Sequence, residues 1–187
     1  MNYSVAFQQP SYHARGGEAG LKYLTRADRY MSFKIIGLDG DSSDRALDPV
    51  AQLDNGFRRR EAQLAANWRL TAKTALDASL SHIAYRYPHF PARDFSGNTG
   101  TLAFHWGLTG KLSVDTALIR DMTPWTDLVA SYRVEERGSL GAAWEVAART
   151  TLRASVGRMK ADYRNPIVLL SGPARTDTGD VAELRAL

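Results

Sequence analysis

The chain has 187 residues, a hydrophobic fraction of 44% and a formal net charge of +4, all ordinary values for a single folded domain. The mean hydropathy is −0.33, and no apolar run approaches the length that a membrane-spanning helix needs. Because the chain contains no cysteine, disulfides and thiolate metal sites are excluded. The only basic run is Arg58-Arg59-Arg60, which is too short to predict a nucleic-acid partner.

Taken in chain order, the apolar residues predict about ten strands. Apolar and polar residues alternate with a period of two, as in Leu64, Ala66, Trp68 and Leu70, so each strand has one apolar and one polar face. The predicted strands are 2–12, 17–25, 29–38, 57–70, 73–87, 97–108, 111–121, 127–146, 149–164 and 174–186. The last is the weakest, because Val181 to Leu187 also fits a short helix.

From residue 25 onward, short and long connections alternate. Short turns are predicted near Arg26-Ala27, Ala72, Gly110 and Ala148, and longer segments at 39–56, 88–96, 122–126 and 165–173. Short turns at one end and long loops at the other are typical of outer-membrane barrels, whose short turns are periplasmic. We therefore predict an all-β fold, an antiparallel up-and-down transmembrane β-barrel. Residues 1–187 would form a single barrel domain or a fragment of a larger barrel.

An internal repeat supports this prediction. Trp68, Trp106 and Trp144 are spaced 38 residues apart (68 to 106, 106 to 144), and segments 64–76, 102–114 and 140–152 align without a gap. The hairpin repeats are clearest over 56–164. Each tryptophan precedes a short turn on the apolar face, so all three are expected at one depth, near the periplasmic membrane interface.

Other aromatic residues extend this pattern. Tyr23 and Tyr30 flank the first short turn and are predicted to lie at the same membrane interface as the tryptophans. At the opposite ends of the strands, four aromatic residues predict an outer girdle: Tyr85, Tyr87, Phe90 and Phe95.

If the apolar faces meet lipid, the alternate residues line the lumen. The candidate lumen-lining residues are Glu61, Arg69, Asp77, His105, Asp115, Arg133, Glu135, Arg137, Glu145 and Arg153. Their mixed charge predicts cross-strand ion pairs in a hydrated passage and does not indicate a strongly anionic cargo. Loop 88–96 is a candidate constriction, or simply a cap over the barrel.

Catalytic features are not evident in the sequence. Ser81 and His82 are neighbours, so they would point to opposite faces of a strand. His105 and Ser79 would share a face, but no nucleophile motif surrounds either serine. The four histidines lack metal-ligand spacing. We therefore predict neither an enzyme nor a metal or other cofactor.

Several motifs resemble one family. They are Phe57 to Leu64, Trp68 with Thr71 and Lys73, Arg93 to Gly100, Trp106, Thr109 to Leu112, and Arg120-Asp121. Over 56–164 the chain resembles the porin-like outer-membrane β-barrel protein (EpsL-like) of exosortase (PEP-CTERM)-linked exopolysaccharide biosynthesis operons. The resemblance implies an outer-membrane location in a Gram-negative cell envelope. It also implies a role in exopolysaccharide export or biosynthesis, as a passage or an assembly component, without catalytic residues.

The partners expected from this reading are outer-membrane lipid, exopolysaccharide and other proteins of the export machinery. Two departures from the family predict a truncated copy: the chain ends on Leu187, where barrels commonly end on an aromatic residue, and it is shorter than the family's chains. The alternatives are a nonfunctional truncated barrel and a soluble or surface-attached β-sandwich that binds or scaffolds. In a sandwich, the face that carries Leu64, Ala66, Trp68 and Leu70 would pack against a second sheet.

Overall fold

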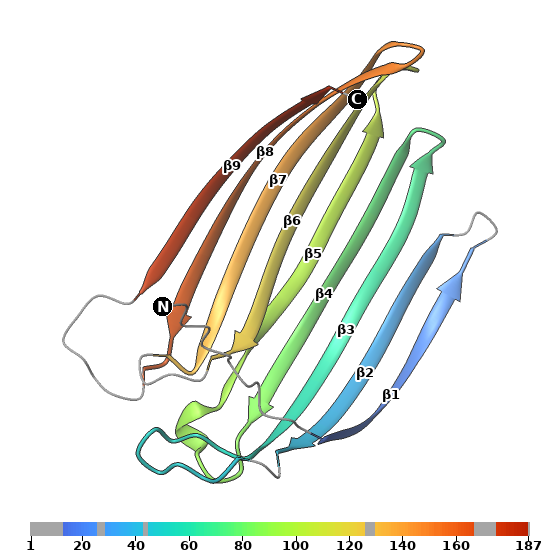
Figure 1. Ribbon diagram of the computed structural model, residues 1–187. Coiled ribbons are helices and arrows are strands. Elements are labelled where there is room, and N and C mark those ends of the chain that lie inside the picture. The colour runs from blue at the N-terminus through green and yellow to red at the C-terminus, as the bar shows by residue number, and fades with distance from the viewer. Residues whose placement is uncertain (1–12, 26–28, 43–44, 126–129, 167–174, 187) are drawn as a thin grey trace, which may run out of the picture.

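The computed structural model describes residues 13–25, 29–42, 45–125, 130–166 and 175–186. In these ranges, nine antiparallel strands form one open sheet in which each strand pairs with the next along the chain (Figure 1). The strands are β1 (His13–Leu24), β2 (Tyr30–Asp41), β3 (Gly56–Thr71), β4 (Thr74–Arg86), β5 (Phe95–Gly107), β6 (Leu112–Pro124), β7 (Tyr132–Ala147), β8 (Thr150–Arg164) and β9 (Thr176–Ala186). The predicted all-β, up-and-down antiparallel arrangement is confirmed.

Nine of the ten predicted strands correspond to β1–β9, and the tenth, 2–12, lies outside the described residues. The weakest prediction, 174–186, is strand β9 and not a helix. The largest difference at a strand start is in β7, which begins at Tyr132 where the sequence predicted 127. The next largest is in β1, which begins at His13 where the sequence predicted 17. Gly16 and Gly17 interrupt the apolar alternation there, although both pair with β2.

Short and long connections alternate as predicted. The short turns follow β1, β3, β5 and β7, and the longer connections 42–55, 87–94, 125–131 and 165–175 join strand ends at the opposite end of the sheet. Connection 87–94 contains a 3₁₀ helix, Pro91–Arg93. No helix in the described part of the chain is long and apolar enough to cross a bilayer.

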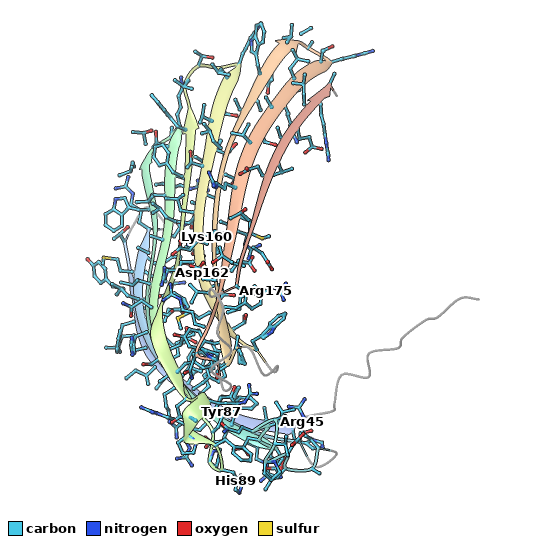
Figure 2. The ribbon with its side chains drawn as sticks, turned by 90° about the vertical axis from the view of Figure 1, so that its left-hand side faces the viewer. Arg45, Tyr87, His89, Lys160, Asp162 and Arg175 are labelled. Atoms are coloured by element: carbon cyan, nitrogen blue, oxygen red, sulfur yellow. The ribbon has the colours of Figure 1, made fainter. Side chains whose placement is uncertain are left out.

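Buried side chains gather at the end with the long connections. One cluster contains Ile83, Phe95, Met122 and Val134, and a second contains Ala130, Ala161 and Tyr163. Pairing of β5 with β6 extends only from Gly107 to Gly100, and beyond it Met122 packs against the first cluster. A Cβ at Gly97 would lie 2.6 Å from the Met122 sulfur, so a larger residue there would displace the Met122 side chain. In Figure 2 the curved sheet has Arg45, Tyr87 and His89 together at this end.

Candidate functional site

Strand pairing defines two faces of the sheet, because residues that lie opposite one another in antiparallel strands project to the same side. One side, here called the tryptophan face, carries Tyr23, Trp68, Trp106 and Trp144. The other side is called the polar face. Both faces can be followed without interruption from β1 to β9 through the body of the sheet.

Apolar side chains cover the middle of the tryptophan face on every strand. Each strand contributes at least one large residue: Leu21, Phe33, Leu64, Leu80, Leu102, Leu118, Leu140, Val156 and Leu184, which are 41% to 81% exposed. The main contacts between described elements all join neighbouring strands, so no second layer covers this apolar belt. Soluble monomers rarely expose a continuous apolar patch beyond a few hundred Å². The belt therefore marks a surface that meets lipid or another apolar layer.

The apolar belt crosses the strands diagonally. One row of directly opposite residues runs, from β1 to β9, through Tyr23, Met31, Ala66, Ala78, Leu102, Leu118, Gly138, Arg158 and Asp180. This row starts at an aromatic residue beside a short turn and ends at an ion pair. It therefore traverses the whole belt in the eight steps between nine strands.

The tilt of the strands relative to the belt follows from the height of the belt and the number of strands that the diagonal row crosses. On the odd-numbered strands, eight residues separate the last polar side chain from the aromatic one: Arg15 to Tyr23, Arg60 to Trp68, Asn98 to Trp106 and Glu136 to Trp144. A row that climbs eight residues in eight steps climbs one residue per strand. With ~3.4 Å per residue and ~4.8 Å between strands, this slope corresponds to a tilt of ~35°. The belt is then ~22 Å tall, close to the ~25 Å apolar band of outer-membrane barrels.

Polar pairs border the belt at the end with the long connections, one pair for each of the four hairpins that these connections close. Arg58 donates to Asp39 at 3.0 Å, and the His82 ring lies 2.8 Å from the Asn98 side-chain oxygen. Arg120 forms an ion pair with Glu136, and Arg158 lies 3.7 Å from Asp180. In each pair the two residues lie directly opposite one another. The belt therefore ends at a regular polar boundary.

The ten candidate lumen residues all fall on the polar face by alternation and register: Glu61, Arg69, Asp77, His105, Asp115, Arg133, Glu135, Arg137, Glu145 and Arg153. Some of them are brought together. The His105 ring lies 2.6 Å from Asp115, and Glu135 accepts from both Arg133 and Arg137 at 2.9 Å.

Glu61 and Asp77 instead bind partners outside this set of ten. Glu61 pairs with Arg59, and Asp77 accepts from Asn67. Within the described part of the chain, Arg69, Glu145 and Arg153 form no side-chain ion pair. Arg59 could have been found from the sequence, because it lies two residues from Glu61 in the same alternating strand.

Two predictions about aromatic residues need correction. Tyr30 lies opposite Leu24 and Asn67 on the polar face, with the Lys22 ammonium 4.1 Å from its ring centre, so it does not extend the tryptophan row. Tyr85 and Phe95 also lie on the polar face, where their rings stack at 4.9 Å. Tyr85 is an odd number of residues from Leu76 and Leu80, so it must face away from them. The predicted outer girdle therefore does not form on the tryptophan face through these two residues.

Side chains at the ends of the strands tie the long connections together. Asp54 accepts from the His89 backbone N–H at 2.8 Å, and its other carboxylate oxygen lies 2.9 Å from the His89 ring nitrogen. Arg93, only 3% exposed, donates to the carbonyl oxygens of Ala51 at 2.7 Å and Trp125 at 3.1 Å. Loop 88–96, the candidate constriction, is thus anchored to its neighbours.

Asn165 completes this network at the end of β8. Its φ of 58° is in the left-handed region, which asparagine tolerates better than most residues. The Asn165 side-chain amide donates to the Ala92 carbonyl at 2.7 Å, and the Asn165 carbonyl accepts from the Ser131 hydroxyl at 2.8 Å. These contacts were missed because they join residues far apart in the sequence, and no local pattern encodes them.

Burial and hydrogen bonding affect titratable groups in these connections. Burial acts to raise the pKa of Asp54, but the hydrogen bonds from His89 and Gly56 outweigh it and hold the pKa below its usual value. Burial raises the pKa of Tyr87 to about 12, so its hydroxyl stays protonated.

The serine and the histidine considered as catalytic candidates both contact other side chains. Ser79 hydrogen-bonds Thr101 at 2.7 Å, while His105 is engaged with Asp115. No group of three metal-binding side chains occurs among the described residues. The main chemical feature of the sheet is the contrast between its faces. One face carries the apolar belt, and the other carries hydrogen-bonding and charged side chains.

No family model matches the chain, and neither a curated protein nor a solved structure is significantly similar to it.

Proposed function

We propose that the nine strands are part of a transmembrane β-barrel in the outer membrane, with the tryptophan face toward lipid and the polar face toward a hydrated lumen. The diagonal belt is the observation that carries this proposal. Barrel strands are tilted by ~35–45°, so a flat bilayer must cut across them diagonally. A belt of constant height, with a slope equivalent to ~35°, fits that requirement.

The two borders of the belt support the same orientation. Trp68, Trp106 and Trp144 follow the border near the short turns, where amphipathic rings favour the membrane interface. The opposite border is made of polar pairs. With the short turns in the periplasm, the anchored long connections would face the outside of the cell.

We further propose that the barrel serves exopolysaccharide export, as a passage or an assembly component working with other proteins of the export machinery. The choice of polysaccharide as cargo rests on the family resemblance. Support from the polar face comes from its hydroxyl and amide groups, such as Gln63, Ser79, Thr99 and Thr101, which lie on neighbouring strands. Such groups can hydrogen-bond an uncharged sugar chain without selecting a strongly charged cargo.

Location and membrane insertion test the first proposal. The chain, expressed with an export leader, should fractionate with the outer membrane and migrate differently on a gel before and after boiling. In single-tryptophan variants, lipids brominated along their acyl chains should quench Trp68, Trp106 and Trp144 to the same extent. Trp125, in a long connection, should be quenched much less. A soluble, folded product without quenching would contradict the barrel and favour a sandwich or scaffold.

Cargo requires a separate measurement once insertion is established. Vesicles that contain the protein should become permeable to neutral oligosaccharides if the barrel is a passage. Inserted protein without permeability would contradict the passage role and leave the assembly role.

A further inference from the structure

A groove of about 660 Å³ lies across β4–β8 beside the polar boundary of the belt. This volume is within the range of small-molecule sites. On the tryptophan face, the groove is lined by Gly100 and Gly138, by the apolar side chains of Leu80, Leu102 and Leu118, and by four charged side chains: Arg120, Glu136, Arg158 and Lys160. It therefore joins an apolar trough to a charged end.

Alternation of large and absent side chains shapes the trough. Along the diagonal of the belt, β4, β6 and β8 carry Leu80, Leu118 and Val156. The strands between them, β5 and β7, carry Gly100 and Gly138. A Cβ at Gly100 would lie 2.7 Å from a backbone oxygen of β4, and a Cβ at Gly138 would lie 3.3 Å from Leu118. The furrows are therefore set by close strand packing at positions that only glycine fills without displacement.

The charged end of the groove consists of three directly opposite residues on neighbouring strands and one adjacent arginine. Arg120, Glu136 and Lys160 lie directly opposite one another on β6, β7 and β8, and Arg158 lies two residues from Lys160 on the same face. Three cations therefore accompany one carboxylate in the groove. Two further carboxylates, Asp162 and Asp180, flank it.

The cations keep hydrogen-bonding capacity beyond these ion pairs. Arg158 is 3.7 Å from Asp180, too far for a hydrogen bond, and its side chain is 73% exposed. Lys160 contacts Asp162 at 2.9 Å (both labelled in Figure 2), and an ammonium group has three donors. An anionic group at the mouth of the groove could accept from both side chains.

We propose that this groove binds a phosphate-bearing lipid. Its acyl chain lies in the furrows at Gly100 and Gly138, and its phosphate accepts hydrogen bonds from Arg158 and Lys160. The inference rests on the proposed membrane orientation, in which a trough in a lipid-facing surface is filled by an acyl chain. The guanidinium group presents N–H donors in a fork that matches phosphate geometry, which favours phosphate as the headgroup anion.

The test compares two lipids at the surface of the inserted protein. The chain is reconstituted into phosphatidylcholine vesicles, and the association of spin-labelled phosphatidic acid is measured against that of spin-labelled phosphatidylcholine. We expect a preference for phosphatidic acid that falls, on the order of fivefold for each cation removed, in Arg158→Gln and Lys160→Gln. Gly138→Leu, which keeps every charge but fills a furrow, should also reduce it.

A matched control separates the site from general charge attraction. Arg153→Gln removes one positive charge from the same strand but on the polar face, so it should leave the preference unchanged. An equal loss in Arg153→Gln, or no loss in the groove variants, would overturn the lipid site. Full competition by inorganic phosphate would also overturn it, because the acyl chain would then contribute nothing.

Tryptophan quenching by brominated lipid is recorded on each sample. Absence of quenching in the unaltered protein would overturn the membrane proposal, and the lipid site with it. Normal quenching without lipid preference would overturn the lipid site alone.

Discussion

The strand body and the loop end of this sheet are held together in different ways. In the strand body the large apolar residues are exposed, and the main connections between strands are backbone hydrogen-bond ladders. At the loop end, Ile83, Met122 and Val134 are buried at 5% exposure or less, and side chains such as Arg93 bridge the connections. The loop end thus resembles the interior of a soluble protein, whereas the strand body lacks such an interior.

This difference indicates which environment each region needs. The loop end covers apolar groups with its own side chains and binds the buried side chains of Asp54 and Arg93 through hydrogen bonds, so it can face water. The strand body leaves a belt whose burial must come from outside the sheet. Truncation of a side chain should therefore destabilise the loop end more than the belt. An added charge should be poorly tolerated in the belt.

The largest effect is expected from truncation in the loop-end cluster. Met122→Ala should lower the free energy of unfolding by about 2–5 kcal/mol, because it leaves a cavity among Ile83, Phe95 and Val134. Met31→Ala, the same change at a 45% exposed belt position, should cost clearly less. Denaturant unfolding of the membrane-inserted protein measures both. Equal losses would mean that the belt is packed as tightly as the cluster.

The next largest effect is expected from a charge placed at mid-belt. Leu102 lies four residues from both Asn98 and Trp106, and Leu102→Arg should cost about 2–4 kcal/mol if this point is the bilayer midplane. Ala103→Arg, the matched change on the polar face, should be tolerated. The same unfolding measurement in vesicles compares them, and equal tolerance of the two arginines would contradict a lipid-facing belt.

A smaller, pH-dependent effect is expected at the Asp54–His89 contact. Asp54→Asn should cost about 1–3 kcal/mol near neutral pH, because the Asp54 side chain is fully buried and accepts several hydrogen bonds. Since the pKa of Asp54 is lowered in the folded protein, its contribution is fully present above the unfolded pKa of about 3.9. It is lost as pH falls through the lower folded pKa.

Unfolding of wild type and Asp54→Asn should therefore differ near neutral pH and converge in acid. Asp48→Asn is a control on the same connection, because Asp48 is exposed and its side chain accepts from the nearby backbone N–H groups of Val50 and Ala51. A difference between wild type and Asp54→Asn that grows on acidification would contradict the assigned sign.

The smallest effect is expected on the polar face. His105→Gln should change stability by less than about 1 kcal/mol, because His105 and Asp115 are 51% and 61% exposed and their interaction is screened by water. Increasing the salt concentration should remove most of the remaining stability difference between wild type and His105→Gln. A loss of several kcal/mol would show that this face is dry and packed, which would contradict a hydrated lumen.

The sequence was sufficient to predict most strands, because alternation and turn position are local properties. The equal spacing of Trp68, Trp106 and Trp144 also placed these three residues on one face. The slope of the belt could not be obtained in this way, because it depends on the register between strands. Tyr30 was misplaced for a similar reason: closeness to a turn does not determine which face a side chain occupies.

The candidate lumen residues could be assigned to one face by counting, but their partners could not all be assigned. Glu135 binds Arg133 and Arg137 on its own strand, whereas His105 and Asp115 meet across two strands. The loop-end contacts were beyond prediction, since Asn165 reaches Ala92 across several strands and the approach depends on the folded sheet.

The odd number of described strands restricts how the sheet can close. In this meander β1 and β9 run in the same direction, from the long connections toward the short turns. If these two edges met directly, they would form a parallel seam. A second copy inserted the same way round would create the same parallel seam at each junction. A closed barrel with antiparallel neighbours throughout must therefore combine these nine strands with an odd number of others.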